Sequence, residues 1–305
     1  MITPTLTPLY TEYRPVQALY RLEADAARDG WRYATRRRAG DIAYDIGRVD
    51  DALAHWQAAN ILQPNQLGLL TRLAETYLAL GQWTPLADTL RALLAVSPGN
   101  AWAQFQLGLV LAPISPAEAR THLRAAALTL DYRPQAGALI LLLEAADANT
   151  DESELAMRVG FIGVEQSRWA HAEHAFRHAA DLAPDNSTAL AYVGLARARQ
   201  GKTADAWLTS ALELNPGDAT AHYVAGLVYA GRGDYEAGVQ AFTLALALDP
   251  LEPAYYAEVA SIYETLGDLP DAEIWLREAV RVAGDIPRYQ QLLADFYVKY
   301  PALTP

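Results

Sequence analysis

A short pattern that recurs along the chain limits its fold more than any other feature of the sequence. Residues 47–64, 167–184 and 233–250 align without gaps, and each segment ends in a proline. In each of them an aromatic residue stands nine positions after the start, and an alanine follows three positions later. Self-similar segments at an interval of about 20–50 residues are typical of arrays in which one structural unit is stacked repeatedly.

The spacing of the closing prolines measures the unit. Pro64 and Pro98 are 34 residues apart, as are Pro216 and Pro250. Ahead of the turn lies a segment such as residues 221–230, whose apolar residues recur every three or four positions, as they do in a helix. Because proline cannot continue a helix, each unit is predicted to be a helix, a short turn with glycine, and a second helix that ends before proline.

These units resemble the tetratricopeptide repeat family. The best match carries Ala225, Gly226, Tyr229, Gly233, Phe242, Ala245 and Pro250 at the family's positions, with Gly238 in place of an alanine. Other matches are Tyr77, Gly81 and Pro98 in residues 67–98, and Tyr263, Gly267, Ala272 and Ala279 in residues 253–284. The resemblance extends over residues 33–286. It implies an all-α, right-handed α-solenoid, a superhelix of about seven helix-turn-helix units.

Three glycines have a predicted structural role in such an array. Gly160, Gly194 and Gly226 occupy the same position in their units, where the two helices would cross. A side chain there would hold the helices apart, and we expect the aromatic residues of the second helices to fill the space between units. Since no unit can bury its apolar face alone, neighbouring units must stack.

One interval between prolines is too long for the repeat. Pro98 and Pro184 are 86 residues apart, which is two periods of 34 plus 18. The surplus predicts an unpaired helix, apolar nearly all round and therefore buried. The predicted organisation is an N-terminal extension with a capping helix (1–32), three units (33–133), the inserted helix (134–150), four units (151–286), and a C-terminal capping helix and tail (287–305).

A second irregularity affects the unit that turns at Gly201. Only 10 residues separate Gly201 from Ala211, against 12 between Gly233 and Ala245, so its second helix is predicted to be short. Helical periodicity without a partner in register begins at residue 14 and runs to residue 29. This helix would cover one apolar end of the array.

The sequence contains no motif for catalysis or for a cofactor. A nucleophile elbow, a phosphate-binding loop and a paired-carboxylate motif are all missing, and cysteine is absent. His171, His174 and His178 share one stripe of a predicted helix, which would suit a transition metal. We expect them instead on an outward, solvated face without further ligands. The prediction is therefore no enzyme, no cofactor and no metal.

In the family, the first helices line a concave groove that binds extended peptides or partner helices. Carried over in register, that role falls on Tyr44, Trp102, Phe105, Met157, Arg158, Phe161, Tyr192, Arg199 and Tyr223. Aromatic residues and arginine dominate protein interfaces energetically. The alternative for each residue is that it packs under a neighbouring helix. We predict a protein-interaction scaffold or adaptor that binds a partner peptide or helix with apolar anchors and at least one carboxylate, and no small-molecule substrate.

Charge is distributed unevenly along the chain. The formal net charge is −12, which argues against a nucleic-acid partner, yet residues 12–38 hold seven arginines against four acids. These arginines either form a solvated face or dock on an anionic partner, with Arg32, Arg36, Arg37 and Arg38 as the docking patch. The alternative function is accordingly a structural subunit or assembly factor of a larger complex, including a membrane-associated one. A secretory signal and a membrane-spanning stretch are not recognisable, so a cytoplasmic location is predicted.

Overall fold

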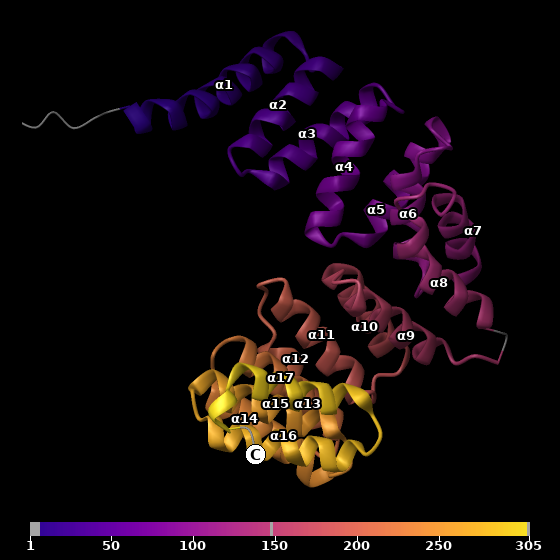
Figure 1. The fold of residues 1–305 in the computed structure, drawn as a ribbon. Helices are drawn as coiled ribbons and strands as arrows, with labels where there is room; N and C mark the ends of the chain where they lie inside the picture. The colour runs from indigo at the N-terminus through magenta and orange to yellow at the C-terminus, as the bar shows by residue number, and fades with distance from the viewer. Residues whose placement is uncertain (1–6, 147–148, 304–305) are drawn as a thin grey trace, which may run out of the picture. The chain divides into compact units, whose positions relative to one another are not determined.

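The computed structural model describes residues 7–146 and 149–303, and side chains from residue 15 onward. The described residues form 17 α-helices and one short 3-10 helix, with no strand among them, which confirms the all-α class (Figure 1). The chain divides into two compact units, Met1–Leu111 with Ser115–Leu141, and Ala112–Ile114 with Leu142–Pro305. Residues 1–6 of the expected N-terminal extension and residues 304–305 of the expected tail lie outside the described residues.

The first unit is built from helical hairpins that follow a long N-terminal helix. Its elements are α1 (Thr7–Asp29), the hairpin α2 (Tyr33–Asp45) and α3 (Val49–Leu62), the hairpin α4 (Leu67–Leu80) and α5 (Trp83–Val96), and the hairpin α6 (Ala101–Leu111) and α7 (Pro116–Ala126). The two helices of each hairpin pack against each other along their length.

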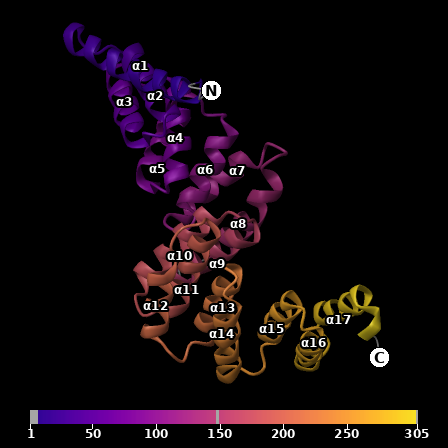
Figure 2. The ribbon, with the colours of Figure 1, turned by 90° about the vertical axis from the view of Figure 1, so that its left-hand side faces the viewer.

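The second unit repeats the same plan and ends in a single helix. Its elements are α9 (Glu152–Glu165) with α10 (Trp169–Leu182), α11 (Ser187–Arg199) with α12 (Asp205–Leu214), α13 (Ala219–Gly231) with α14 (Tyr235–Leu248), α15 (Pro253–Leu266) with α16 (Leu269–Ala283), α17 (Pro287–Lys299) and the 3-10 helix Pro301–Leu303. Figure 2 shows α13 beside α14, and α17 following α16.

The two helices of a hairpin cross where the first helix has glycine. A Cβ atom built on Gly226 would lie 2.5 Å from Cε1 of Phe242, and one on Gly194 would lie 2.9 Å from Cδ2 of Leu208. Gly160 faces Phe176 in the same way. The predicted role of all three glycines is confirmed, because a side chain at any of them would force its hairpin apart.

The same crossing occurs in the first unit, where the sequence analysis did not assign it. A Cβ atom on Gly40 would collide with the Trp56 ring, and one on Gly108 would lie 2.7 Å from Cγ of Leu123. Both partner side chains are fully buried. Glycine on the first helix and a large residue on the second are thus common to both units.

The helix α8 (Arg133–Ala145) joins none of these hairpins. It was expected to be buried all round, but that expectation was wrong. Its side chains Ala136, Leu139 and Leu143 are buried, whereas Leu141 is 69% exposed. The run of apolar letters therefore overstated burial, because the helix packs along one face only.

Two helix boundaries bear on the predicted irregularities. The second helix α12 has 10 residues, whereas α10 and α14 have 14 each, so the predicted shortening is confirmed. The N-terminal helix begins earlier than expected, at Thr7 rather than residue 14, and continues through Pro15. Proline inside a helix removes one backbone hydrogen bond, and its ring clashes with the carbonyl four residues earlier, which together cost about 3 kcal/mol or more.

Candidate protein-binding surfaces

Aromatic side chains gather on the first helices of the second unit. On α9 and α11, Phe161 and Tyr192 meet edge to face with ring centroids 4.8 Å apart, and Tyr192 stacks on Phe176 of α10 at 5.1 Å. Phe161 and Tyr192 are both half-buried. They hold the two repeats together and leave part of each ring accessible.

A second aromatic group follows on α13 and α15. The ring of Tyr223 lies 5.0 Å from that of Tyr255 and 5.7 Å from that of Phe242. Tyr223 is half-buried, while Phe242 is fully buried. Each group thus pairs a buried phenylalanine at the helix crossing with a tyrosine that reaches the surface.

Burial and charge tune the titratable groups beside these rings. Burial raises the pKa of Tyr192 to about 12, and burial together with the nearby Glu258 carboxylate raises the pKa of Tyr223 above its ordinary value. Burial also raises the pKa of Glu258, against the opposing effect of Arg288 and Arg199. Both phenols therefore remain protonated near neutral pH and can donate hydrogen bonds to a partner.

A pocket of about 210 Å³ with a mixed polar and apolar lining opens between α11 and α13. Leu195, Leu227 and Val228 form its apolar part, and the side chains of Arg199 and Arg232 stand around it. Arg232 makes an ion pair with Asp205 at the start of α12, and the guanidinium of Arg199 lies 5.6 Å from the Trp169 ring. Ala198 and Gly231 complete the lining of this pocket.

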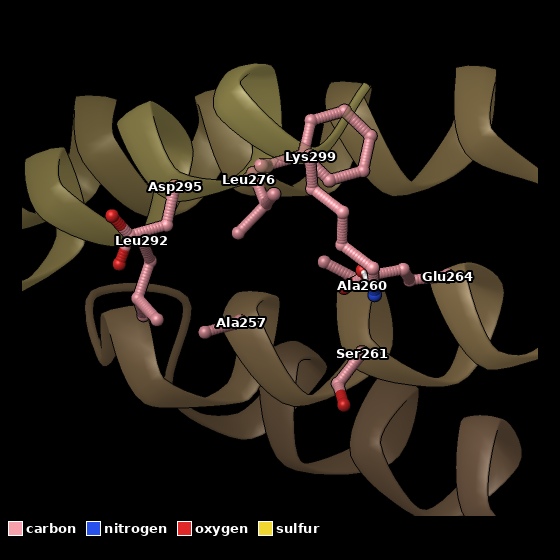
Figure 3. Close-up of a pocket in the computed structure, with 9 residues that line it drawn as sticks. Ala257, Ala260, Ser261, Glu264, Leu276, Leu292, Asp295 and Lys299 are labelled. Carbon is pink, nitrogen blue, oxygen red and sulfur yellow. Dashed lines mark hydrogen bonds and ion pairs between the residues drawn. The ribbon is translucent and has the colours of Figure 1, made fainter.

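A second pocket, of about 220 Å³, lies between α15 and α17 (Figure 3). It exists because α15 carries Ala257 and Ser261 where α13, 34 residues earlier, carries Tyr223 and Leu227. Figure 3 shows Lys299 reaching from α17 towards Glu264 on α15, and their charged groups form an ion pair of 2.7 Å.

Two residues predicted for the groove belong to the core. Phe105 is fully buried and packs on Tyr132 at 4.9 Å, and Met157 is 8% exposed within the apolar cluster around Phe176. Neither can contact a partner in this structure. A neighbouring helix or loop covers both positions, in agreement with the alternative that such a residue packs under its neighbours.

The other predicted groove residues remain accessible to different degrees. Arg158 and Arg199 are exposed on the second unit. In the first unit Trp102 is half-buried, and Tyr44 is 44% exposed with its ring 5.5 Å from that of Trp56. The structure brings Phe161 together with Tyr192, while Tyr44 and Trp102 lie on separate hairpins of the first unit.

The arginines predicted as a docking patch have divided roles. Arg36 lies over the Trp31 ring at 3.7 Å and contacts Nδ1 of His55 at 3.1 Å, so it packs within the fold. Arg37 is within 3.9 Å of the Asp41 carboxylate. Arg32 and Arg38 are exposed, and Arg38 lines a hollow of about 420 Å³ between α1 and α2 together with Arg21, Asp25 and other residues.

The three histidines of α10 do not form the solvated face that was expected. His174 is 8% exposed, and burial of the His171 ring, aided by the charges of Arg168 and His174, lowers the pKa of His171 to about 3. Between them lies Glu173, a buried carboxylate. Among the described residues, no three histidine or acidic side chains are placed to share a metal ion.

The buried position of Glu173 was not anticipated from the sequence. Its side chain is 6% exposed and accepts from Arg197 at 2.9 Å, Lys202 at 3.0 Å and Gln200 at 2.9 Å. These hydrogen bonds outweigh burial and hold the pKa of Glu173 below its usual value. The cluster ties α10 to the end of α11 and the turn that follows it. A charged residue in the middle of a second helix does not by itself indicate such a contact in the sequence.

Sequence reasoning also missed part of the pocket between α11 and α13. Leu195 and Leu227 occupy the position of Phe161 in later repeats, so the repeat register could have identified them. Arg232 lies in a turn, and from sequence alone a residue in a turn indicates only a connection between two helices. Only the fold places it beside Arg199.

The family model for the tetratricopeptide repeat matches three overlapping segments, residues 164–219, 206–253 and 223–287. These residues are tetratricopeptide repeats. The matched region runs from the last turn of α9 to the first residue of α17, and the pocket between α11 and α13 lies within it. A search of curated proteins found no matching sequence.

Three solved structures resemble the chain at low identity. The crystal structure of yeast Tom70 is 14% identical with a TM-score of 0.40, over 87% of this chain and 72% of Tom70. MamA of MSR-1 is 19% identical with a TM-score of 0.34, over 60% of this chain and 96% of MamA. MamA of AMB-1 is 20% identical with a TM-score of 0.35, over 59% of this chain and 97% of that MamA.

No described helix combines the length and apolar character that crossing a bilayer requires.

Proposed function

We propose that this protein is an interaction scaffold and that its tetratricopeptide repeats bind a segment of a partner protein along the first helices of the second unit. The pocket between α11 and α13 carries the proposal, because it is open, combines leucine and valine side chains with polar groups, and has two arginines at its edge. Enzymatic activity forms no part of the proposed function.

The surroundings of the pocket suit a protein partner. Half-buried Tyr192 and Tyr223 lie on the same two helices, α11 and α13, and half-buried Phe161 lies on α9. Interfaces favour rigid aromatic rings that keep a polar edge, together with arginine. Because packing already fixes these rings, binding would immobilise few additional side chains and would cost little conformational entropy.

The test fills the pocket without disturbing the core. Ala198 lines the pocket and is half-buried, so Ala198→Trp places a ring in the binding space. Ala206→Trp on the exposed side of α12 is the matched control. Both full-length variants are used as bait in native cells, and captured proteins are quantified by mass spectrometry. We expect specific partners to be lost with Ala198→Trp and retained with Ala206→Trp.

The result that contradicts the proposal is equal capture by both variants, provided that their circular dichroism spectra match that of the wild type. Photo-crosslinking from position 199 gives an independent measurement, since a bound segment would crosslink there and not from position 206. Crosslinks from position 206 alone would place the interface on the second helices.

A second candidate function is a structural subunit of a larger complex, docked through the basic N-terminal helices. The observation in its favour is the hollow between α1 and α2, which is lined by Arg21 and Arg38. Arg21→Glu with Arg38→Glu should then abolish stoichiometric co-purification, while Ala198→Trp leaves it intact. The reverse pattern contradicts this candidate. A cytoplasmic location stays a prediction.

A further inference from the structure

We propose that the repeats of the second unit select an extended peptide with two anchors. The first anchor is an aliphatic residue next to an aspartate or glutamate, bound between α11 and α13. The second is an apolar residue about five or six positions along, bound between α15 and α17. This inference rests on the proposed function and names the class of peptide that the same surface takes.

Charge around the first pocket favours an acidic residue. The side chains that line this pocket or join it through an ion pair are Arg199 and Arg232 against Asp205. Two positive groups and one negative group leave a net +1 (2 − 1), in a chain whose net charge is −12. A peptide carboxylate would therefore find its complement here.

Within that set, Arg199 is the side chain most available to a ligand. Asp205 holds Arg232 in an ion pair, whereas the charged neighbour of Arg199 is the half-buried carboxylate of Glu258 on α15. Arg199 is exposed at the end of α11, and its guanidinium lies 5.6 Å from the centre of the Trp169 ring. A guanidinium beside an aromatic ring is well placed to donate two hydrogen bonds to a planar carboxylate.

The pocket interior favours an aliphatic side chain. Leu195 and Val228 are buried at its base, and Leu227 is half-buried beside them. The volume of about 210 Å³ is several times the roughly 30 Å³ of one water molecule. Filling it with a branched apolar side chain removes apolar surface from water on both partners.

The second pocket has an apolar interior and an acidic rim. Leu276 and Phe296 are buried at its base, and small residues on α15 leave the space above them open (Figure 3). The ion pair between Lys299 and Glu264 closes one side, and Asp295 also lines the pocket. Because these three groups leave one net negative charge at the rim, this pocket is expected to select an apolar side chain without a neighbouring acidic residue.

The distance between the pockets sets the spacing of the anchors. One pocket lies between α11 and α13 and the other between α15 and α17, so they are two helix spacings apart. Packed helices lie about 8–10 Å apart, which gives about 16–20 Å. An extended peptide advances about 3.3 Å per residue and covers that distance in about five or six residues.

The experiment selects binders from a displayed library of random linear 16-residue peptides. The full-length wild-type protein is the bait, and Ala198→Trp is used for counter-selection. We expect enriched peptides to carry Leu, Ile, Val or Met adjacent to Asp or Glu, with a second apolar residue five or six positions away. Arg199→Glu should weaken a representative peptide at least tenfold, and the matched control Arg281→Glu on exposed α16 should leave binding within twofold.

The possible failures are distinguishable. If no peptide binds wild type better than Ala198→Trp, the proposed function itself is contradicted. If pocket-dependent peptides emerge without enriched carboxylates, or with Lys or Arg in their place, only the present inference is overturned. Apolar residues spaced three and four apart would show a helical occupant and would likewise overturn the extended geometry.

Discussion

The hairpins α9–α10 and α13–α14 share one backbone plan and differ in almost every polar residue. Both cross at a glycine that faces a phenylalanine, Gly160 with Phe176 and Gly226 with Phe242. Both second helices have 14 residues. The close approach of the helices at the crossing is thus the common element, and it constrains the hairpin more than any hydrogen bond does.

The hairpins differ at the turn and at the start of the second helix. In α13–α14 the turn residue is Gly233 with φ 82°, and the side chain of Asp234 caps the helix by accepting from Ala237 N at 3.3 Å. In α9–α10 the turn residue is Ser167 with φ 56°, and Arg168 at the cap cannot accept a hydrogen bond.

The interior of α10 also replaces apolar contacts with charge. Glu173 stands where α14 has Val239, and its buried carboxylate is held by Arg197 and Lys202. The comparison teaches that a repeat keeps its shape while its local stabilising interactions are exchanged. It also predicts that the hairpin α9–α10 is more sensitive than α13–α14 to mutation at polar sites and to low pH.

The largest effect should come from breaking the shared crossing. Gly226→Leu places a side chain where even a Cβ atom would lie 2.5 Å from Phe242, so we expect a loss of about 3 kcal/mol in the free energy of unfolding. Chemical denaturation measures the loss, and amide exchange should rise in α13–α14. Gly68→Leu is the control, since a Cβ atom there meets nothing within 4 Å.

A milder change tests whether the crossing is a matched pair. In the hairpin α15–α16 the crossing positions hold Ala260 and Leu276, which pack in one buried cluster. We therefore expect Gly226→Ala and Phe242→Leu each to destabilise, and the double variant to lose at least about 1 kcal/mol less than the sum. A double-mutant cycle measures this coupling, and strict additivity would contradict the matched-pair explanation.

Removing the charge of Glu173 should weaken the contact between α10 and α11 specifically. Glu173→Gln leaves Arg197 and Lys202 without their carboxylate, and we expect a loss of about 2 kcal/mol, which is below the usual 3–5 because both cations are partly solvated. Faster amide exchange should be confined to α10 and α11. Glu213→Gln on exposed α12 serves as the control, and an equal loss there would refute the assignment.

Exchanging the turn residues should move stability in opposite directions. Ser167→Gly relieves a left-handed backbone conformation and is expected to stabilise by about 1 kcal/mol, because that conformation costs a residue with a Cβ about 1–2 kcal/mol. Gly233→Ser should destabilise by a similar amount. Thermal melting of both variants tests the pair, and a change of the same sign in both would contradict it.

The smallest effect is a pH dependence carried by α10. The pKa of His171 is lowered from 6.5 to about 3 in the folded state, chiefly by burial. The unfolded chain thus binds a proton more readily, so stability is retained above pH 6.5 and is lost as the pH falls towards 3. His171→Gln should flatten this slope between pH 6.5 and 4 in melting experiments, whereas His222→Gln, on α13, should not.

Repeat architecture could be predicted from the sequence because periodic features are local. The turn at Gly233, the shortened helix after Gly201 and the crossing at Gly226 each follow from spacing within one unit. The crossing at Gly40 obeys the same rule and could have been found. The start of α1 could not have been predicted, because a proline such as Pro15 ordinarily indicates a break in a helix. Only the tertiary structure shows that the helix continues through it.

Accessibility could not be predicted in the same way. Phe105, Met157 and His174 stand at positions that the repeat register assigns to a surface, and all three are buried. Their burial depends on side chains from other units or from loops, whose lengths vary. A register defines the direction of a side chain and contains no information about what covers it.

Taken alone, the sequence determined the helical hairpin, its turn and the close crossing of its helices, because glycine spacing and apolar periodicity act within about 34 residues. Tertiary structure alone decided that Arg232 stands beside Arg199, that Glu173 is enclosed by cations, and that a pocket opens where α15 has Ala257. These contacts join residues on different helices. Their formation depends on the three-dimensional stacking of hairpins rather than on the sequence pattern of any one hairpin.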